Sequence, residues 1–387
     1  MAYTLVPRLP RMFLYHFSHS FLLHLNKTQH QVETILTNLK PHFIFFDFSL
    51  WMPALAHQIG TKAIYYAVVC AVGLASIAPT KTKPEDMTLE DLMQPPPGYP
   101  SSSVQLKSKD FEMDQLKMSI KDHGDGVSLF VRITSGMIRS DAIALRTYHE
   151  VEGPYCDYLR QHVGKPVLLT GPLLPQVSAT KLDEKWTNWL GNFKQGSVVY
   201  CAFGSQNTLQ KEQFQELLLG FELCGQPFLV ALSTPYGCTT IEEALPEGFE
   251  ERVKGRGWVY EGWVPQTMLL DHPSVGCFVS HCGYGSMWEA LFSDCQIVCV
   301  PDLVDQILDA RLMAEELKVA VEVEREDNGW ISKERLSDAI ISVMDKDSEV
   351  GRLVKSKHAK LKQELSCQGV QERYFDTFIQ SLQGLLI

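Results

Sequence analysis

The stretch from residue 275 to residue 289 constrains the fold of this chain more than any other. The apolar run Val275–Ser280 is typical of a buried strand, and the polar-faced sequence after Gly283 predicts a helix. A strand that turns directly into a helix is one unit of a parallel sheet. The helix start offers unpaired N–H groups and the positive end of the helix dipole, which favour a phosphate. Gly283 and Gly285 would let the backbone approach such an anion closely.

The same alternation of strand and helix patterns runs through most of the chain, and it predicts the α/β class. Because 387 residues are too many for one ordinary core, we expect two doubly wound, Rossmann-like domains that face each other across a cleft. We place the first domain at 1–175, the second at 176–369 and a terminal helix at 370–387. Strands are predicted at Phe43–Phe48, Lys62–Val69, Ala142–Arg146, Val167–Thr170, Ser197–Ala202, Pro227–Leu232, Gly257–Tyr260, Val275–Ser280 and Val319–Val323.

Glycine and proline mark the connections between these elements. The Gly171–Pro175 stretch ends the first domain, and a polar linker is expected to continue to about Lys185. Residues Lys81–Ser103 are rich in proline, serine and acidic side chains, which predicts a surface loop. Long loops in compact domains often bind ligands.

Composition excludes several classes of partner. A net charge of −11 and a pI near 5.6 disfavour nucleic acid and anionic membrane surfaces. The longest apolar run, Ile64–Pro79, is too short for a membrane span. The ten cysteines show no paired metal-ligand spacing, so we expect free thiols, no metal and a cytoplasmic protein. A monomer is expected.

Eleven residues between Trp263 and Gln306 sit at the spacings of the signature box of plant UDP-glycosyltransferases, which this chain therefore resembles. The resemblance implies the two-domain GT-B arrangement and inverting transfer of a sugar from a UDP-sugar to an acceptor hydroxyl. The matching positions are Trp263, Gln266, His272, Gly276, His281, Gly283, Ser286, Glu289, Pro301, Asp305 and Gln306.

Two positions of the box depart from the common family pattern. Tyr284 stands where most members have Trp, and Gly285 stands where most have Asn, a residue that usually contacts the donor. The form HCGYGSMWEAL is similar to the branch that adds a second sugar to a flavonoid or anthocyanin glycoside. The resemblance therefore implies a small-molecule glycoside as acceptor.

The resemblance also implies how the donor is held. Trp263 would stack on uracil, with Val264 and Gln266 at its polar edges, and Glu289 would accept from the ribose hydroxyls. The pyrophosphate would be held by Ser205, His281 and Ser286 with the turn Gly283-Tyr284-Gly285, and the sugar by Asp305 and Gln306. No cofactor and no metal are implied; the co-substrate is a UDP-sugar such as UDP-glucose, UDP-rhamnose or UDP-xylose.

Transfer to a hydroxyl requires a general base. In the family this base is a histidine in a Gly-His turn after the first strand, positioned by an aspartate whose motif Asp47 matches. None of His16, His19, His24 and His30 lies in such a turn. We therefore expect that the first domain lacks its opening β-α units and that the base histidine is missing.

Other interpretations remain open at this stage. Trp263 could be a core aromatic, Glu289 a solvated carboxylate and Asp47 a strand-end carboxylate. The chain could bind UDP-sugar without transferring it. A nicotinamide-dependent oxidoreductase is suggested by Gly283-x-Gly285, but Trp288 occupies the third glycine position of that fingerprint.

Overall fold

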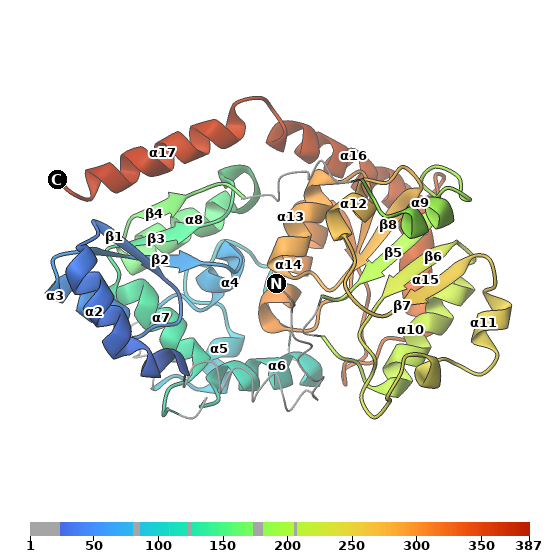
Figure 1. The fold of residues 1–387 in the computed structure, drawn as a ribbon, viewed down its shortest axis with the longest axis horizontal. Coiled ribbons are helices and arrows are strands. Elements are labelled where there is room, and N and C mark those ends of the chain that lie inside the picture. The colour runs from blue at the N-terminus through green and yellow to red at the C-terminus, as the bar shows by residue number, and fades with distance from the viewer. Residues whose placement is uncertain (1–23, 80–85, 108, 123–124, 173–180, 205–206) are drawn as a thin grey trace.

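The structure, a computed structural model, describes residues 24–79, 86–107, 109–122, 125–172, 181–204 and 207–387. Two parallel sheets lie at opposite ends of the molecule, and α4, α13 and α14 lie between them (Figure 1). The α/β class and the two-sheet architecture agree with the sequence prediction. Among the described residues, none of the helices combines the length and apolar character of a membrane span.

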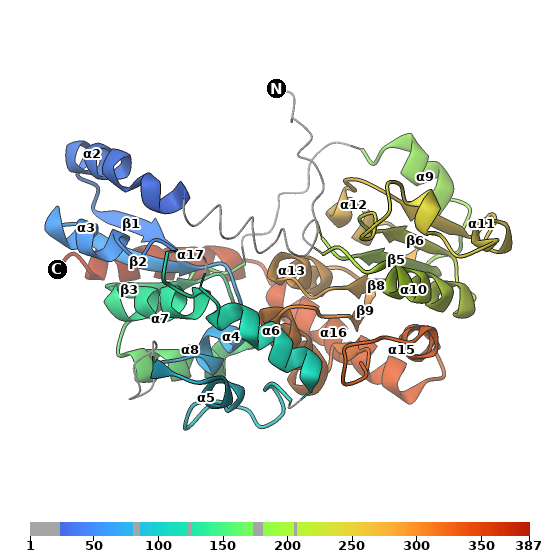
Figure 2. The same ribbon diagram turned by 90° about the horizontal axis from the view of Figure 1, so that it is seen from below.

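The first sheet contains four parallel strands in chain order: β1 (Phe43–Phe46), β2 (Lys62–Ala67), β3 (Ala142–Leu145) and β4 (Val167–Leu169). All four residues of β3 are buried because helices cover both of its faces. The terminal helix covers one face, because its Phe378 and Leu382 are buried with Ala142 and Ala144 of β3. The other helices on this half of the molecule are α2 (Gln29–Leu39), α3 (Met52–Gln58), α4 (Ala71–Ser76), α7 (Leu129–Arg139) and α8 (His149–Val163) (Figures 1 and 2).

The second sheet contains six parallel strands in the order β10-β9-β8-β5-β6-β7. The chain starts in the middle, at β5, builds outward to β7, and then returns to β8 on the other side of β5. Such a reversal creates a crevice at the carboxyl ends of the two central strands. The bounds are β5 Val198–Ala202, β6 Phe228–Ala231, β7 Gly257–Tyr260, β8 Val275–Ser280, β9 Gln296–Cys299 and β10 Ala320–Glu322.

Two layers of helices bury this sheet. Phe214, Phe221 and Leu336 pack on one face with Val199 and Val230. On the other face, the rings of Tyr200 in β5 and Phe278 in β8 are stacked on each other, and buried helix residues such as Leu291 belong to the same core. The helices are α9 (Glu184–Leu190), α10 (Lys211–Leu223), α11 (Phe249–Arg252), α12 (Gln266–Leu270), α13 (Tyr284–Phe292), α14 (Val304–Arg311), α15 (Lys333–Met344) and α16 (Glu349–Leu365).

The last helix, α17 (Val370–Gly384), returns to the first sheet (Figure 1). Its Phe378 and Leu382 are buried with Ile64 and Ala144 of β2 and β3. At its start, the Gln371 Oε1 accepts a hydrogen bond of 2.6 Å from the Tyr148 hydroxyl. We call the part of the molecule with the four-stranded sheet the first half and the part with the six-stranded sheet the second half. The chain therefore crosses between the two halves twice.

Three regions differ from the sequence prediction. Of the loop predicted at Lys81–Ser103, residues 81–85 lie outside the described residues, and the described remainder contains α5 (Leu89–Met93), whose start is closed by reciprocal bonds between Thr88 and Asp91. The expected linker, which was to end at about Lys185, runs into α9 (Glu184–Leu190), a helix that was not predicted and in which Trp186 is buried. The strand β9 is not among the predicted strands. Further elements are α6 (Asp110–Ile120), a 3₁₀ turn at Glu242–Ala244 and the π-helical turn at Leu312–Glu316.

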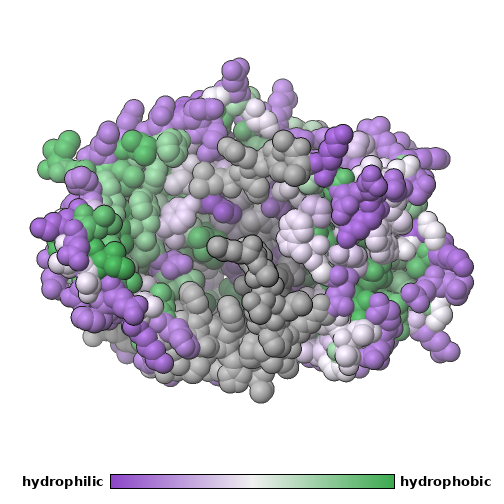
Figure 3. All heavy atoms as spheres, in the orientation of Figure 1, coloured by the Kyte–Doolittle hydropathy of each residue, from purple (hydrophilic) through white to green (hydrophobic). Residues whose placement is uncertain are grey.

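Figure 3 shows the face of the molecule seen in Figure 1. Apolar surface gathers there on the side of the first sheet. On that half, Ile35, Leu39, Phe45 and Phe375 are exposed apolar side chains. The second half shows a more mixed surface in this view, with polar residues prominent at its outer end.

Candidate functional site

The carboxyl ends of β5 and β8 meet at the reversal point of the second sheet. Ala202 pairs with Ser280 across the two strands, so the segments that follow, at Gly204 and His281, lie side by side. A Cβ atom at Gly204 would lie 3.2 Å from the His281 ring, and one at Gly283 would lie 2.5 Å from its Nε2. Glycine at both positions therefore lets the imidazole pack against two stretches of backbone. The turn into α13 is made by Cys282, which has a φ of 63°.

His281 directly follows β8 and is partly buried. Burial lowers the pKa of its imidazole, against the opposing effects of the Ala202 backbone and Asp302. The buried Nδ1 has no hydrogen-bond partner among the described residues. Because buried polar atoms are nearly always hydrogen-bonded, this nitrogen is an unusual group at the end of β8.

A hydrogen-bonded cluster joins α12 to α13 beside this turn. The Gln266 Nε2 donates to Ser286 Oγ at 3.0 Å and to Glu289 Oε2 at 2.6 Å. The Gln266 Oε1 accepts from the Tyr200 hydroxyl of β5 at 3.3 Å. Burial raises the pKa of the Glu289 carboxyl, while Gln266 and Arg146 act in the opposite direction. Three of the predicted residues therefore form one connected group.

Trp263 lies just before this cluster and is the most exposed tryptophan of the second half, with 82% of its surface accessible. The interpretation of Trp263 as a core aromatic is therefore wrong. The N–H of Gln266 donates to the Val264 carbonyl at 2.9 Å, which fixes a tight turn between the indole and the cluster. An exposed indole beside a polar cluster provides a flat surface for stacking.

Asp305 and Gln306 lie at the start of α14, after β9. The Gln306 Oε1 accepts hydrogen bonds from the backbone N–H groups of Asp302 and Leu303, at 3.0 and 3.1 Å. Gln306 thus caps its own helix, and only its amide N–H groups remain for another partner. Burial raises the pKa of the Asp305 carboxyl, although backbone hydrogen bonds oppose this effect.

The two positions that depart from the common family pattern contact the first half of the molecule. Tyr284 is buried, and its hydroxyl donates to the Arg146 carbonyl at 2.9 Å and contacts Glu152 Oε2 at 3.2 Å. Its side chain is therefore engaged between the two halves. Gly285 is exposed, and the nearest atom to a Cβ there is Arg146 Nη2, at 3.9 Å.

Sequence reasoning did not single out Arg146, although it is the last residue of the strand predicted at Ala142–Arg146; the observed β3 ends one residue earlier. Ser205 lies outside the described residues, so its position is not stated.

Asp47 follows β1 and is partly buried. Its Oδ1 accepts a hydrogen bond of 2.6 Å from the N–H of Phe48. None of the histidines in the described part of the chain is hydrogen-bonded to it. Asp47 adds to the effect of burial in raising the pKa of Tyr65. The carboxylate has thus no described general base beside it.

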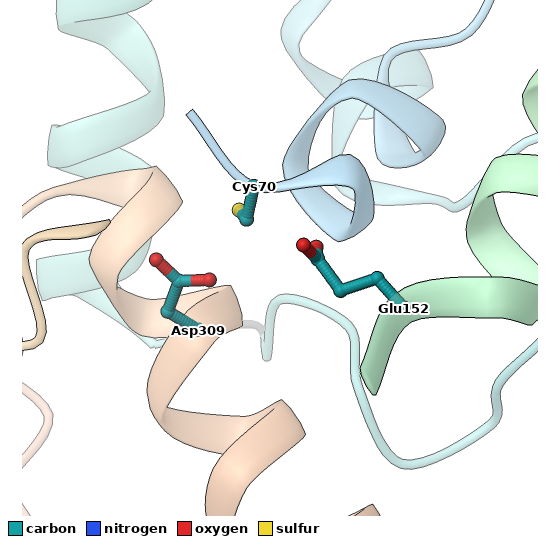
Figure 4. Close-up of side chains that lie close together, drawn as sticks. All are labelled: Cys70, Glu152 and Asp309. Atoms are coloured by element: carbon teal, nitrogen blue, oxygen red, sulfur yellow. The ribbon is translucent and has the colours of Figure 1, made fainter. Parts of the chain in front are cut away.

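A second group of ionisable side chains lies between the two halves, where Cys70, Glu152 and Asp309 point toward one another from α4, α8 and α14 (Figure 4). Their ligand atoms lie within 4.8 Å of each other, a spacing that could hold a metal ion. Glu152 already accepts from the Val72 N–H at 3.1 Å, whereas neither oxygen of Asp309 has a hydrogen-bond partner among the described residues. Burial raises the pKa of all three groups. Burial therefore favours the protonated form of both carboxyl groups.

A cavity of about 330 Å³ lies elsewhere, between α6, the end of α14 and α16. Its walls include Phe111 and Arg325, and the buried ion pair of Glu112 with Arg311 lies in its lining. None of the predicted donor residues lines it. We therefore place the candidate site at the β5–β8 crevice, where the partnerless ring nitrogen, the exposed indole and the carboxylate cluster occur.

Comparison with known proteins defines the class to which this architecture belongs. The chain superimposes on UGT2 of Phytolacca americana, solved with UDP-2-fluoro-glucose and pterostilbene, with a TM-score of 0.77 over 96% of this chain and 82% of the other, at 21% identity. It also superimposes on UGT71G1 of Medicago truncatula, solved with UDP-glucose, with a TM-score of 0.75 at 20% identity, over 98% of this chain and 84% of the other. The fold is thus the GT-B fold.

Sequence comparison is more specific. Residues 182–359 match the family model described as UDP-glucoronosyl and UDP-glucosyl transferase. UDP-glycosyltransferase 79B2 of Arabidopsis thaliana is 52% identical over 361 residues, which are 93% of this chain and 77% of the relative. Anthocyanidin 3-O-glucoside 2'''-O-xylosyltransferase of the same plant is 47% identical over 95% of this chain and 80% of its own length. The chain belongs to the UDP-glycosyltransferase family and is a transferase by that membership.

Proposed function

We propose that this chain binds a UDP-sugar in the β5–β8 crevice and transfers the sugar, with inversion, to a hydroxyl of a flavonoid or anthocyanin glycoside. The observation that carries the proposal is the Gln266–Ser286–Glu289 cluster beside the exposed Trp263. The choice of acceptor is supported by the 47% identical relative whose name specifies an anthocyanidin glucoside.

The proposed roles follow from what each group can offer. Trp263 stacks on uracil, and the Val264 backbone and Gln266 recognise its polar edge. The Glu289 carboxylate accepts from the ribose hydroxyls, because a carboxylate has free acceptor sites beyond its bond with Gln266. His281, Ser286 and the start of α13 hold the pyrophosphate, where N–H groups and the helix dipole favour negative charge. Ser205 is assigned to the same group from the sequence alone.

In the transfer step, the acceptor oxygen attacks the anomeric carbon and the bond from that carbon to the β-phosphate oxygen breaks. UDP leaves with the electron pair, and the acceptor proton passes to a base. Asp305 and Gln306 orient the sugar. Asp47 positions the base if one is present. The donors consistent with this site are UDP-glucose, UDP-rhamnose and UDP-xylose.

A second candidate function is UDP-sugar binding with impaired transfer. It is favoured by the fact that none of the described histidines is bonded to Asp47, whereas the donor cluster is fully connected. The two functions share the donor site and differ only in turnover.

We further propose the division into an acceptor domain at 1–175, a donor domain at 176–369 and a helix at 370–387 that packs on the acceptor domain. The contacts of Phe378 and Gln371 with the first half support it. All ten cysteines are free thiols, which supports a cytoplasmic location.

The direct test combines binding and turnover. The purified chain is titrated with UDP by calorimetry, and then incubated with each of the three UDP-sugars and an anthocyanidin 3-O-glucoside, with products identified by mass spectrometry. A sugar added to the glucoside supports transfer, and UDP binding without product selects the second candidate. Absence of UDP binding would overturn both.

A further inference from the structure

Arg146 is a cation of the first half that faces the donor crevice of the second half. It directly follows β3, at the carboxyl edge of the first sheet, where open α/β sheets hold their ligands. Its Nη2 lies 3.9 Å from the position that a Cβ would occupy at Gly285, the second residue of α13. Its guanidinium carbon lies 5.6 Å from the centre of the Tyr284 ring.

The guanidinium has no charged partner of its own. Among the residues that the structure describes, no carboxylate pairs with Arg146 and no hydrogen bond is formed by its side chain; its Nε is buried and partnerless. The nearest acidic influence is at longer range, since Arg146 lowers the pKa of Glu289 against the effect of burial. A partly buried cation without a partner is costly unless a ligand completes it.

The position of the Arg146 guanidinium near the start of α13 increases this free-energy cost. The N-terminus of α13 carries the positive end of a helix dipole, so the guanidinium and the helix end repel each other. An anion between them removes both penalties at once. Arginine suits such a ligand because its N–H groups form paired, charge-assisted bonds with phosphate oxygens.

Gly285 explains how the cation can reach this position. A larger side chain there would extend toward the guanidinium, whereas the glycine leaves the helix end open. The position of Arg146 is held from the backbone, because its carbonyl accepts the Tyr284 hydroxyl at 2.9 Å. Tyr284 and Gly285 therefore both allow Arg146 of the first half to lie close to the start of α13 in the second half.

We propose that Arg146 binds the diphosphate of the UDP donor from the first half, opposite the start of α13, and so replaces the contact that Gly285 cannot make. This inference rests on the proposed function, since it assigns a further residue to the same donor site. It also makes the diphosphate a link between the two halves.

The test compares ligands that differ only in phosphate, bound to the full chain and followed by calorimetry. Arg146→Met keeps the length and the backbone contact with Tyr284 but removes the charge. We expect it to weaken UDP binding about 10- to 100-fold and UMP binding less, with uridine binding unchanged. Arg146→Lys restores part of the UDP affinity, and the control Arg139→Met, at an exposed arginine, changes none of the three affinities.

Unchanged UDP affinity in Arg146→Met, or an equal loss for UDP and uridine, would overturn the assignment of Arg146. If the unaltered chain binds no UDP, the proposed function itself fails. The two failures are thus distinguishable, and thermal unfolding of each variant shows whether the fold is retained.

Discussion

The proposed site carboxylates of the two halves, Glu289 and Asp47, differ in their hydrogen-bond partners. In the second half, Glu289 is joined to Gln266 and through it to Ser286 and Tyr200, so three elements (β5, α12 and α13) fix one donor cluster. In the first half, Asp47 is bonded to its own neighbour in the chain and to no described histidine. The comparison teaches that the residues proposed to hold the donor are organised before a ligand arrives, whereas among the described residues the proposed catalytic aspartate is bonded only to the N–H of Phe48.

The largest predicted effect is on the rate of sugar transfer, and its measurement can contradict this comparison most directly. We expect the chain to bind UDP but to transfer sugar about 10²- to 10⁴-fold more slowly than its xylosyltransferase relative. A general base contributes a factor of about this size, and none of the described histidines is bonded to Asp47. Both proteins are assayed with UDP-xylose and an anthocyanidin 3-O-glucoside. Equal rates would show that another residue accepts the proton.

Glu289→Ala tests the proposed donor cluster of the second half. Its removal leaves the ribose hydroxyls without a charged acceptor, and bonds of this type contribute roughly 1.5–3 kcal/mol each, so we expect a loss of UDP affinity of about 100-fold or more. Calorimetry measures it, with Glu250→Ala on the exposed surface of α11 as the control. If the affinity is retained, Glu289 does not belong to the site.

Gly283→Ala tests the packing of the imidazole. The added methyl would lie 2.5 Å from Nε2 of His281, so the ring must move and the proposed phosphate contact is displaced. We expect about 10-fold weaker UDP binding, or 1.4 kcal/mol. Gly384→Ala near the end of α17 is the control, because a Cβ there would have no atom within 4 Å. Equal affinities for the two variants would exclude His281 from the site.

Asp309→Asn concerns the boundary between the halves and has the smallest expected effect. The folded pKa of Asp309 is raised by burial above the unfolded value of about 3.9, so the folded state binds the proton more tightly. Stability is therefore lost as pH rises from about 3.9 through the raised pKa. The amide avoids this loss, and at pH 8 we expect the variant to be more stable by about 1 kcal/mol.

Thermal unfolding at pH 5 and pH 8 measures this difference. The gain should be larger at pH 8 than at pH 5, and Asp338→Asn at an exposed position of α15 should show no gain at either pH. A variant that is less stable at pH 8 would mean that the Asp309 carboxylate is satisfied in its charged form.

The fold was predictable because its signals are local. The run Val275–Ser280 is apolar throughout and ends in a glycine turn, and the strand observed there has the predicted bounds. The helix α5 also had a local signal, since Thr88 and Asp91 have the spacing of a capping box, but the surrounding prolines favoured a loop. In α9, tertiary packing of Trp186 against Trp258 decides the structure, and a polar sequence does not reveal it.

The candidate site was predictable only within one half. The residues from Trp263 to Glu289 lie within one continuous stretch that contains α12, β8 and α13, so the sequence could group them. The approach of Arg146 to Gly285, and the meeting of Cys70 with Glu152 and Asp309, join elements that are far apart in the chain. Such contacts depend on how the two sheets are placed, which no local pattern encodes.

The capping bonds of Gln306 have a consequence for the choice of sugar. With its oxygen engaged by two backbone N–H groups, the amide can address a donor only through hydrogens. Every pyranose presents lone pairs to such a group, whether it is a hexose, a deoxyhexose or a pentose. Discrimination among glucose, rhamnose and xylose must then depend on shape and on other acceptors in the crevice, and a change of Gln306 would alter how firmly a sugar is held more than which sugar is chosen.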